Sequence, residues 1–157
     1  MRIGLGYDTH ALVQGRPLVL GGVTIAHEYG LAGHSDADVL THALMDAIVG
    51  ALREGDIGRL FPDTDSAYAG ADSLQLLEQV ADLMRRREFE LVDADCVLVC
   101  EEPKVSPYRE QMRENLASAL GVAVESIGIK ATTTEGLGFE GRREGIGAYA
   151  VVLLEAK

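Results

Sequence analysis

Residues 34–53, which read HSDADVLTHALMDAIVGALR, decide the fold. The apolar residues of ALMDAIVGAL recur with the spacing of one helix face, so the sequence predicts a helix over residues 36–53. We expect Ser35 to cap its N-terminus, with Asp38 as the acidic member of a capping-box-like arrangement. This helix supplies an apolar face that must be buried against neighbouring elements.

Along the sequence, strands are predicted before and after this helix, and two further helices are predicted later in the chain. Gly21-Gly22 suits a tight hairpin turn, because glycine readily adopts positive φ. Ser106-Pro107 and Gly121 are typical of the two ends of a helix. The predicted strands cover residues 1–7, 18–20, 23–25, 89–100, 126–131 and 146–154, and the other helices cover 73–87 and the segment that ends at Gly121. The loop 54–71 is long enough to suggest a functional segment.

The predicted order β-ββ-α-α-β-α-β-β favours an α+β fold, with helices packed on one face of a mixed β-sheet. A chain of 157 residues fits one domain, which we expect to span residues 1–157. Residues 148–154 are apolar on both strand faces. That pattern suits either a central buried strand or a strand whose second face meets another subunit.

The charge of the chain argues against a nucleic-acid partner. Lys and Arg number 14 and Asp and Glu number 25, so the formal net charge is −11. The one basic cluster, Arg85-Arg86-Arg87, is predicted to lie in the last turn of a helix. No segment approaches the roughly 18 apolar residues of a membrane span, and we expect a cytoplasmic protein without a membrane partner. A small phosphorylated substrate remains compatible, since metals and backbone N–H groups can hold phosphates.

Two cysteines, Cys96 and Cys100, lie on the strand predicted over residues 89–100. Four residues of extended chain separate their Cα atoms by about 13 Å, which is too far for a disulfide. We expect two small buried side chains rather than a metal or redox pair.

One group of residues predicts a metal site. Asp8 and His10 point to the same side of the first strand, at its end, because strand residues two apart share a face. Asp38, His42 and Asp46 follow one face of the first helix, since each step of four residues turns only about 40°. If strand and helix meet, Asp8, His10 and His42 form a ligand set that zinc accepts, with a fourth position left open. Asp38 and Asp46 are then expected to support the ligands from beside His42, with Asp46 bonding its other ring nitrogen.

Two further segments suit phosphate binding. His34 and Ser35 precede the first helix, whose N-terminal N–H groups could hold an anion, although Ser35 could equally serve as a cap alone. Residues 130–139, KATTTEGLGF, run from a strand into hydroxyls, a carboxylate and glycines, which suits phosphates and a hydrated Mg²⁺.

At these residues the chain resembles the 2-C-methyl-D-erythritol 2,4-cyclodiphosphate synthase family of the non-mevalonate isoprenoid pathway. The matching segments lie in the family's order over residues 2–142: RIGLGYDTH, GLAGHSDADVLTHALMDAIVGA, GDIGRLFPDTD, EEPKVSPY and IKATTTEGLGFEGR. The resemblance implies a lyase that converts 4-diphosphocytidyl-2-C-methyl-D-erythritol 2-phosphate to the cyclic diphosphate and CMP. It also implies a homotrimer with active sites between subunits.

The resemblance implies a role for particular residues. Asp8, His10 and His42 fall on the zinc ligands, and Glu135 falls on the ligand of a Mg²⁺ or Mn²⁺ ion that bridges the substrate phosphates. His34 and Thr133 match positions that stabilise the transition state. The implied substrate contacts around these groups are Asp8, Thr9, His10, His34, Ser35, Asp56, Ile57, Gly58, Phe61, Pro62, Asp63, Thr64, Asp65, Cys100, Glu101, Glu102, Pro103, Lys104, Val105, Ser106, Ala131, Thr132, Thr133, Thr134, Glu135, Phe139 and Arg142.

One position departs from the family pattern. Arg143 stands where the family usually has a small residue, in Gly141-Arg142-Arg143-Glu144-Gly145. We therefore expect any isoprenoid diphosphate in the trimer cavity to bind differently here. Two other functions remain as alternatives, a zinc-dependent phosphohydrolase and a non-catalytic isoprenoid-diphosphate sensor or scaffold.

Overall fold

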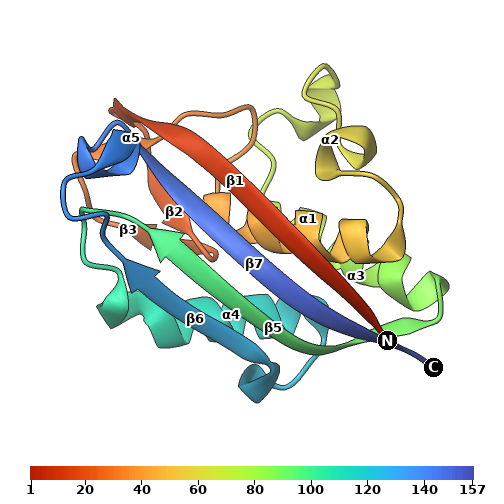
Figure 1. Ribbon diagram of the computed structural model, residues 1–157. Helices are drawn as coiled ribbons and strands as arrows, with labels where there is room; N and C mark the ends of the chain where they lie inside the picture. Colours follow the sequence, from red (N-terminus) through yellow and green to blue (C-terminus); the bar gives the residue numbers. More distant parts are fainter.

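The computed structural model describes residues 1–157 (Figure 1). The strands and the longer helices lie close to their predicted positions. Strands are β1 (Arg2–Gln14), β2 (Leu18–Leu20), β3 (Val23–Ile25), β4 (Tyr29–Leu31), β5 (Phe89–Val99), β6 (Ile127–Thr132) and β7 (Gly145–Ala156). Helices are α1 (Val39–Leu52), α2 (Ile57–Leu60), α3 (Ser73–Arg86), α4 (Arg109–Leu120) and α5 (Gly138–Gly141). Short 3-10 turns cover Ser66–Tyr68, Ser106–Tyr108 and Val124–Ser126.

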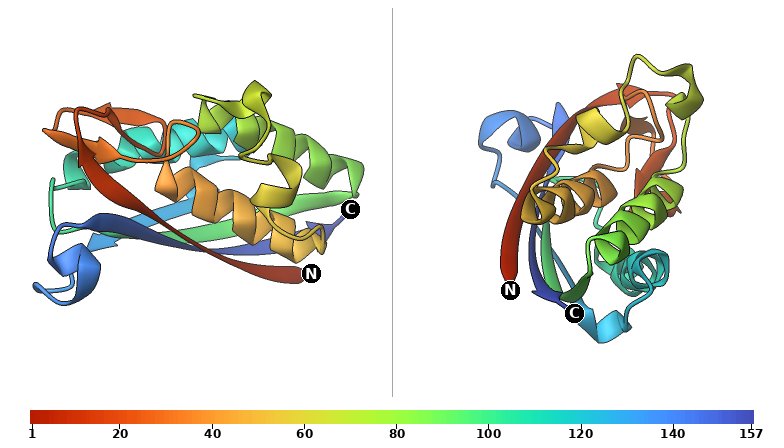
Figure 2. Two further views of the ribbon diagram at one scale, coloured as in Figure 1. Left: turned by 90° about the horizontal axis from the view of Figure 1, so that it is seen from above. Right: turned by 90° about the vertical axis from the view of Figure 1, so that its right-hand side faces the viewer.

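Five strands form one sheet in the order β4-β1-β7-β5-β6, and β2 and β3 form a separate hairpin. Only β5 and β6 run parallel, so the sheet is mixed, as predicted. The long helices α1, α3 and α4 cover one face of the sheet (Figure 2). Thirty-eight buried side chains form one cluster between the layers, and the α+β prediction is confirmed.

Strand β7 lies at the centre of the sheet, between β1 and β5. Its inward side chains are buried, whereas Tyr149 and Val151 on the other face are exposed. Ile3, Leu5 and Tyr7 of the paired strand β1 are exposed as well. The sheet therefore has a second apolar face that no helix of this chain covers.

Helix α1 begins later than predicted. Ala37 has a left-handed backbone with φ of 56°, which a right-handed helix excludes. Asp38 rather than Ser35 is the N-cap, and its carboxylate accepts the backbone N–H of Thr41. The predicted start at residue 36 and the Ser35 cap are therefore wrong.

Four further differences concern short or terminal segments. Strand β1 continues past residue 7 to Gln14, the loop 54–71 contains α2 and a 3-10 turn, and β4 and α5 are additional elements. The Pro107 segment forms a 3-10 turn that leads into α4, while Gly121 ends α4 in the left-handed conformation as predicted.

Cys96 and Cys100 are both free and buried, and burial raises the pKa of their thiols to about 12 and about 11. None of the helices has the length and apolar character needed to cross a membrane.

Candidate metal centre and active site

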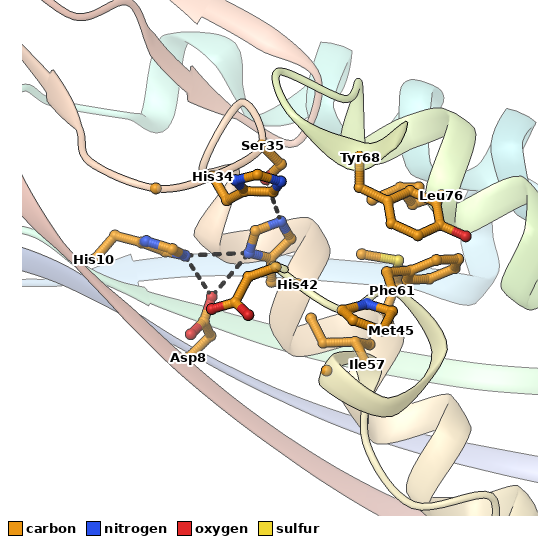
Figure 3. Close-up of a pocket in the computed structure, with 14 residues that line it drawn as sticks. Asp8, His10, His34, Ser35, His42, Met45, Ile57, Phe61, Tyr68 and Leu76 are labelled. Atoms are coloured by element: carbon orange, nitrogen blue, oxygen red, sulfur yellow. Dashed lines mark hydrogen bonds and ion pairs between the residues drawn. The ribbon is translucent and has the colours of Figure 1, made fainter. Parts of the chain in front are cut away.

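Strand β1 and helix α1 bring three ligand side chains to one point. The Asp8 Oδ2 atom lies 3.0 Å from His10 Nε2 and 3.0 Å from His42 Nδ1, and the two ring nitrogens are 3.2 Å apart (Figure 3). Tetrahedral zinc with bonds of about 2.0–2.1 Å needs its ligand atoms about 3.3 Å apart. One carboxylate and two imidazoles at this spacing fit a divalent metal.

The close approach of β1 and α1 depends on two glycines. A Cβ atom at Gly6 would lie 1.9 Å from the carbonyl oxygen of Ala43, and one at Gly4 would lie 1.9 Å from that of Ala47. The alternating glycines let the strand lie directly on the helix backbone. His42, one residue after Thr41 on α1, can then meet Asp8 and His10 of β1.

The three side chains together favour a positive charge at their centre. Burial alone raises the pKa of the Asp8 carboxyl, but hydrogen bonds from His10 and His42 outweigh burial and hold this pKa well below its usual range. Burial lowers the pKa of His10, but the Asp8 carboxylate outweighs burial and the pKa of His10 is raised. A carboxylate that stays ionised between two imidazoles is suited to hold a cation.

The remaining ring nitrogens are fixed by other groups, which set the tautomers. His10 Nδ1 donates to the backbone oxygen of Ala32 at 2.7 Å, so His10 Nε2 is left to face the centre. The Ser73 hydroxyl donates to Asp36, and so its oxygen accepts the N–H of His42 Nε2 at 2.9 Å. When the rings are neutral, these contacts leave the lone pairs of His10 Nε2 and His42 Nδ1 for a metal ion at the centre, whereas protonated rings donate hydrogen bonds to Asp8.

The predicted roles of Asp46 and Asp38 beside His42 are wrong. Asp46 accepts the backbone N–H of Ile57 at 2.8 Å and thereby holds the start of α2. Asp38 is fully buried and accepts N–H groups of Gly21 and Gly22 as well as Thr41, joining the β2–β3 turn to α1. Asp46 lies on α1 and Asp38 caps it, but both carboxylates accept hydrogen bonds from backbone N–H groups of neighbouring segments rather than from His42.

A cavity of about 480 Å³ opens beside the Asp8, His10 and His42 cluster. Nine of the residues expected to contact substrate line it together with His42: Asp8, His10, His34, Ser35, Ile57, Gly58, Phe61, Pro62 and Asp63. Gly33, Met45, Tyr68 and Leu76 also line it and were not predicted. Met45 follows His42 by three residues on α1, so helical spacing could have indicated it.

Four expected contacts on the same side of the molecule do not line this cavity. Thr9 faces the opposite way on β1 and donates to the backbone oxygen of Ile146. Asp56 caps α2, Asp65 caps the 3-10 turn at residue 66, and Thr64 lies outside the lining as well. The Asp65 backbone oxygen lies 3.2 Å from His34 Nε2, so this loop contacts the site through its main chain.

The other expected contacts gather at the carboxyl ends of β5 and β6. Val105, Ser106 and Ala131 line a small cavity of about 100 Å³ there. Glu102 and Arg142 line another cavity, of about 400 Å³, with Arg143. Thr133 and Glu135 are exposed, and Glu135 does not join the Asp8 cluster within one chain. The sequence-predicted site therefore consists of two separate parts on one chain.

Comparison with known proteins gives the family. The model of the YgbB family matches residues 1–155. The chain belongs to the YgbB family. Relatives named 2-C-methyl-D-erythritol 2,4-cyclodiphosphate synthase include one from Desulfitobacterium hafniense, 58% identical over 154 residues with 98% of each chain covered. Another, from Geotalea uraniireducens, is 58% identical over 157 residues with 100% of each chain covered.

Solved structures share the fold of this YgbB-family chain. The bifunctional IspDF from Campylobacter jejuni superposes with a TM-score of 0.96 at 44% identity, covering 99% of this chain and 42% of that one. A 2C-methyl-D-erythritol-2,4-cyclodiphosphate synthase in a CDP-bound form superposes with a TM-score of 0.90 at 40% identity, covering 98% and 100%. The Plasmodium falciparum IspF CDP complex gives 0.87 at 32% identity, covering 99% and 96%.

The hydroxyl and carboxyl groups that orient the His42 imidazole of this YgbB-family chain were missed. Ser73 and Asp36 come from α3 and from the loop before α1, and the sequence offers no spacing that relates either one to His42. Asp36 accepts both the N–H and the hydroxyl of Ser73, so it fixes the N-terminus of α3 beside the metal ligands. Ser73 as the first residue of a predicted helix was the one available signal.

Proposed function

We propose that the chain catalyses the reaction for which its relatives are named. It converts 4-diphosphocytidyl-2-C-methyl-D-erythritol 2-phosphate to 2-C-methyl-D-erythritol 2,4-cyclodiphosphate and CMP. The observation that carries the proposal is the convergence of Asp8, His10 and His42 at a cavity, in a chain 58% identical to such synthases along 98% of its length.

In this reaction an oxygen of the 2-phosphate attacks the β-phosphorus of the diphosphate in the same molecule. The new P–O bond closes the ring, and the bond from the β-phosphorus to the bridging oxygen breaks, so its electron pair leaves with CMP. No water is consumed, and the protein has to bring two anionic groups of one substrate together. A site that excludes water and neutralises charge is suited to this task.

Asp8, His10 and His42 hold the first metal ion, which we assign as Zn²⁺ from the mixed nitrogen and oxygen ligand set. When bound, Zn²⁺ polarises a phosphate oxygen and lowers the cost of charge on the attacked phosphorus. His34 lines the same cavity, and we assign it to a phosphate oxygen there. Ile57, Gly58 and Phe61 form the wall that faces the methylerythritol part.

The second part of the site holds the nucleotide and the second metal. We assign Mg²⁺ or Mn²⁺ to Glu135, whose exposed carboxylate fits a hydrated ion that also binds phosphates. Thr133 is assigned to a phosphate oxygen. The cytidine is assigned to Cys100–Ser106 with Ala131 and Thr132, where backbone groups at two parallel strand ends can contact the base.

We further propose a homotrimer in which the two parts of the site come from different subunits. Two observations support it. The Asp8 cluster and Glu135 lie apart within one chain, and the sheet carries an apolar face over Ile3, Leu5, Tyr7, Tyr149 and Val151 that no helix covers. Association through that face would remove apolar surface from water. The cytoplasmic location remains a prediction.

The expected effect of Arg143 on isoprenoid-diphosphate binding in the trimer cavity can be tested separately. Its backbone is left-handed with φ of 60°, and its guanidinium pairs with Glu102 at 3.0 Å beside Arg142. We predict that the native protein and the Arg143→Gly variant bind geranyl diphosphate with different affinities in calorimetry. Equal affinities of the two proteins would show that Arg143 does not affect the binding of geranyl diphosphate.

The reaction is tested by ³¹P NMR of the purified protein with the substrate, in metal-stripped and in Zn²⁺- and Mg²⁺-restored samples. Metal-dependent formation of the cyclic diphosphate with an equal amount of CMP supports the proposal. Free phosphate or a linear diphosphate indicates the phosphohydrolase instead. No turnover together with tight binding of a prenyl diphosphate indicates a sensor.

A further inference from the structure

Strands β5 and β6 place two functional segments next to each other. They run parallel, with Val99 opposite Thr132, and the pairing continues through a hydrogen bond from Cys100 N–H to the Thr132 oxygen. Parallel strands end at the same edge of a sheet. The segment that follows β5 therefore begins beside the segment that follows β6, which carries Glu135.

One side-chain atom joins these two segments. Glu101 Oε1 accepts the backbone N–H of Thr134 at 2.8 Å and the backbone N–H of Gly136 at 3.4 Å, and the Thr134 hydroxyl, which donates to the Leu137 oxygen, lies 3.3 Å away. The two N–H donors belong to the residues immediately before and after Glu135. Because one acceptor binds both neighbours, it fixes the direction in which the Glu135 side chain leaves the turn.

The turn needs such support because its backbone is unfavourable for an ordinary residue. Glu135 has φ of 53°, in the left-handed region, and Gly136 follows with φ of 82°. Within the turn, the Glu135 N–H donates to Thr133 Oγ1 at 3.3 Å, the Leu137 N–H donates to the Thr134 oxygen at 3.1 Å, and the Thr134 hydroxyl donates to the Leu137 oxygen. None of these bonds holds the Gly136 N–H. Without Glu101 the Gly136 N–H would have no partner within the protein.

The charge state of Glu101 agrees with this contact. Hydrogen bonding from the Thr134 N–H lowers the pKa of the Glu101 carboxyl below its usual value, because the bond favours the ionised form. An ionised acceptor forms stronger hydrogen bonds to backbone N–H groups than a neutral one. The carboxylate is consequently occupied by the turn rather than free for a substrate.

We infer that Glu101 is a positioning residue, which orients Glu135 toward a phosphate-bound divalent cation by clamping the turn Thr134–Gly136. The inference deepens the proposed function, on which it rests for the assignment of the cation to Glu135. It replaces the direct substrate contact that the family resemblance implies for Glu101. It also makes the nucleoside segment and the cation segment one unit.

The test compares three variants. Glu101→Ala removes the acceptor, Glu101→Gln keeps a side-chain oxygen where Oε1 lies, and Glu125→Ala removes an exposed carboxylate at the opposite end of β6 as a control. Mn²⁺ serves as the probe, and its affinity is measured by electron paramagnetic resonance in the presence of CDP. Amide hydrogen exchange of Thr134 and Gly136 is measured by NMR on the same samples, and zinc content confirms that the Asp8 cluster is intact.

We expect Glu101→Ala to weaken Mn²⁺ binding about tenfold and to speed exchange of both amides, with zinc content unchanged. Glu101→Gln should stay within about twofold of the native protein, as should Glu125→Ala. Unchanged Mn²⁺ affinity in Glu101→Ala would overturn the inference. So would equal losses in the Ala and Gln variants, because that result would make Glu101 a direct ligand of the cation.

Failure of the proposed function gives a different result. A native protein that forms no cyclic diphosphate, yet shows this pattern of Mn²⁺ affinity and amide exchange, would refute the reaction and support the positioning role. A native protein that forms the product while Glu101→Ala keeps its Mn²⁺ affinity would refute the positioning role alone.

Discussion

Replacement of Gly6 by alanine should disable the metal centre without touching a ligand. The new Cβ would lie 1.9 Å from the Ala43 carbonyl oxygen, and an ordinary contact begins at 3.4 Å, so β1 and α1 must separate locally by about 1.5 Å. The strand carries Asp8 two residues further on, and the helix carries His42. Their ligand atoms are 3.0 Å apart, whereas a metal site tolerates errors of about 0.2 Å.

Two effects of different size should follow from this separation. Overpacking at the layer interface should lower the free energy of unfolding by about 1–3 kcal/mol, which a core of this size can withstand. Zinc affinity should fall by at least about 10- to 100-fold, because three atoms can no longer converge on one ion. Metal binding should therefore fail well before the fold does.

The assay pairs urea unfolding with zinc content, and Gly50→Ala is the matched control. Gly50 lies in α1 with open space where its Cβ would be, and alanine in a helix interior should stabilise the protein by up to about 1 kcal/mol. The same substitution thus has opposite effects at Gly6, on the strand, and at Gly50, on the helix. A Gly6→Ala protein with native zinc content and native stability would refute the role of close strand–helix contact.

Three further predictions concern individual side chains. His42→Ala should lose zinc and turnover while circular dichroism remains native, because the apolar side chains of α1 are untouched; full turnover without zinc would contradict the ligand assignment. Glu135→Gln should raise the Mg²⁺ concentration needed for half-maximal activity and leave zinc content near native, so loss of zinc there would contradict the division between two metals. Burial raises the pKa of the Asp46 carboxyl above its usual value, so the native state holds this proton to higher pH than the unfolded chain does. The stability that this proton contributes is present below the unfolded-state pKa and is lost as pH rises through the raised pKa of the native state. Asp46→Asn keeps an oxygen for the Ile57 N–H and should remove this part of the pH dependence in metal-free urea titrations; identical slopes in both proteins would contradict it.

Sequence periodicity predicted the parts of the site that lie within single regular elements. Asp8 and His10 share a face because strands repeat every two residues, and His42 lies on a helix that is buried on nearly every side. That the two elements meet follows from the need to bury their apolar faces, and the structure confirms it. Short elements such as β4 and α5 gave no signal, because three or four residues do not display a period.

The groups around the ligands were not predictable in the same way. Asp46 follows His42 at the right helical spacing, yet Ser73 from α3 bonds the His42 ring instead. Spacing along one helix indicates which side chains share a face, but it does not say which other segment packs against that face. Prediction of the Ser73 contact would have required the packing of α1 against α3 beforehand.

The late start of α1 has a consequence for the metal ligands. Because Ala37 is left-handed and Asp38 caps the helix, residues 32–36 remain a loop above the cluster rather than a first helical turn. From that loop the Ala32 oxygen fixes the ring of His10, and Asp36 holds Ser73 against the ring of His42. A helix that began at residue 36 would draw Asp36 into its first turn, and Ser73 would lose the carboxylate that holds it against the His42 ring. The local preference for a longer helix is thus overridden where the chain must orient two metal ligands, which is where departures from local sequence rules are expected.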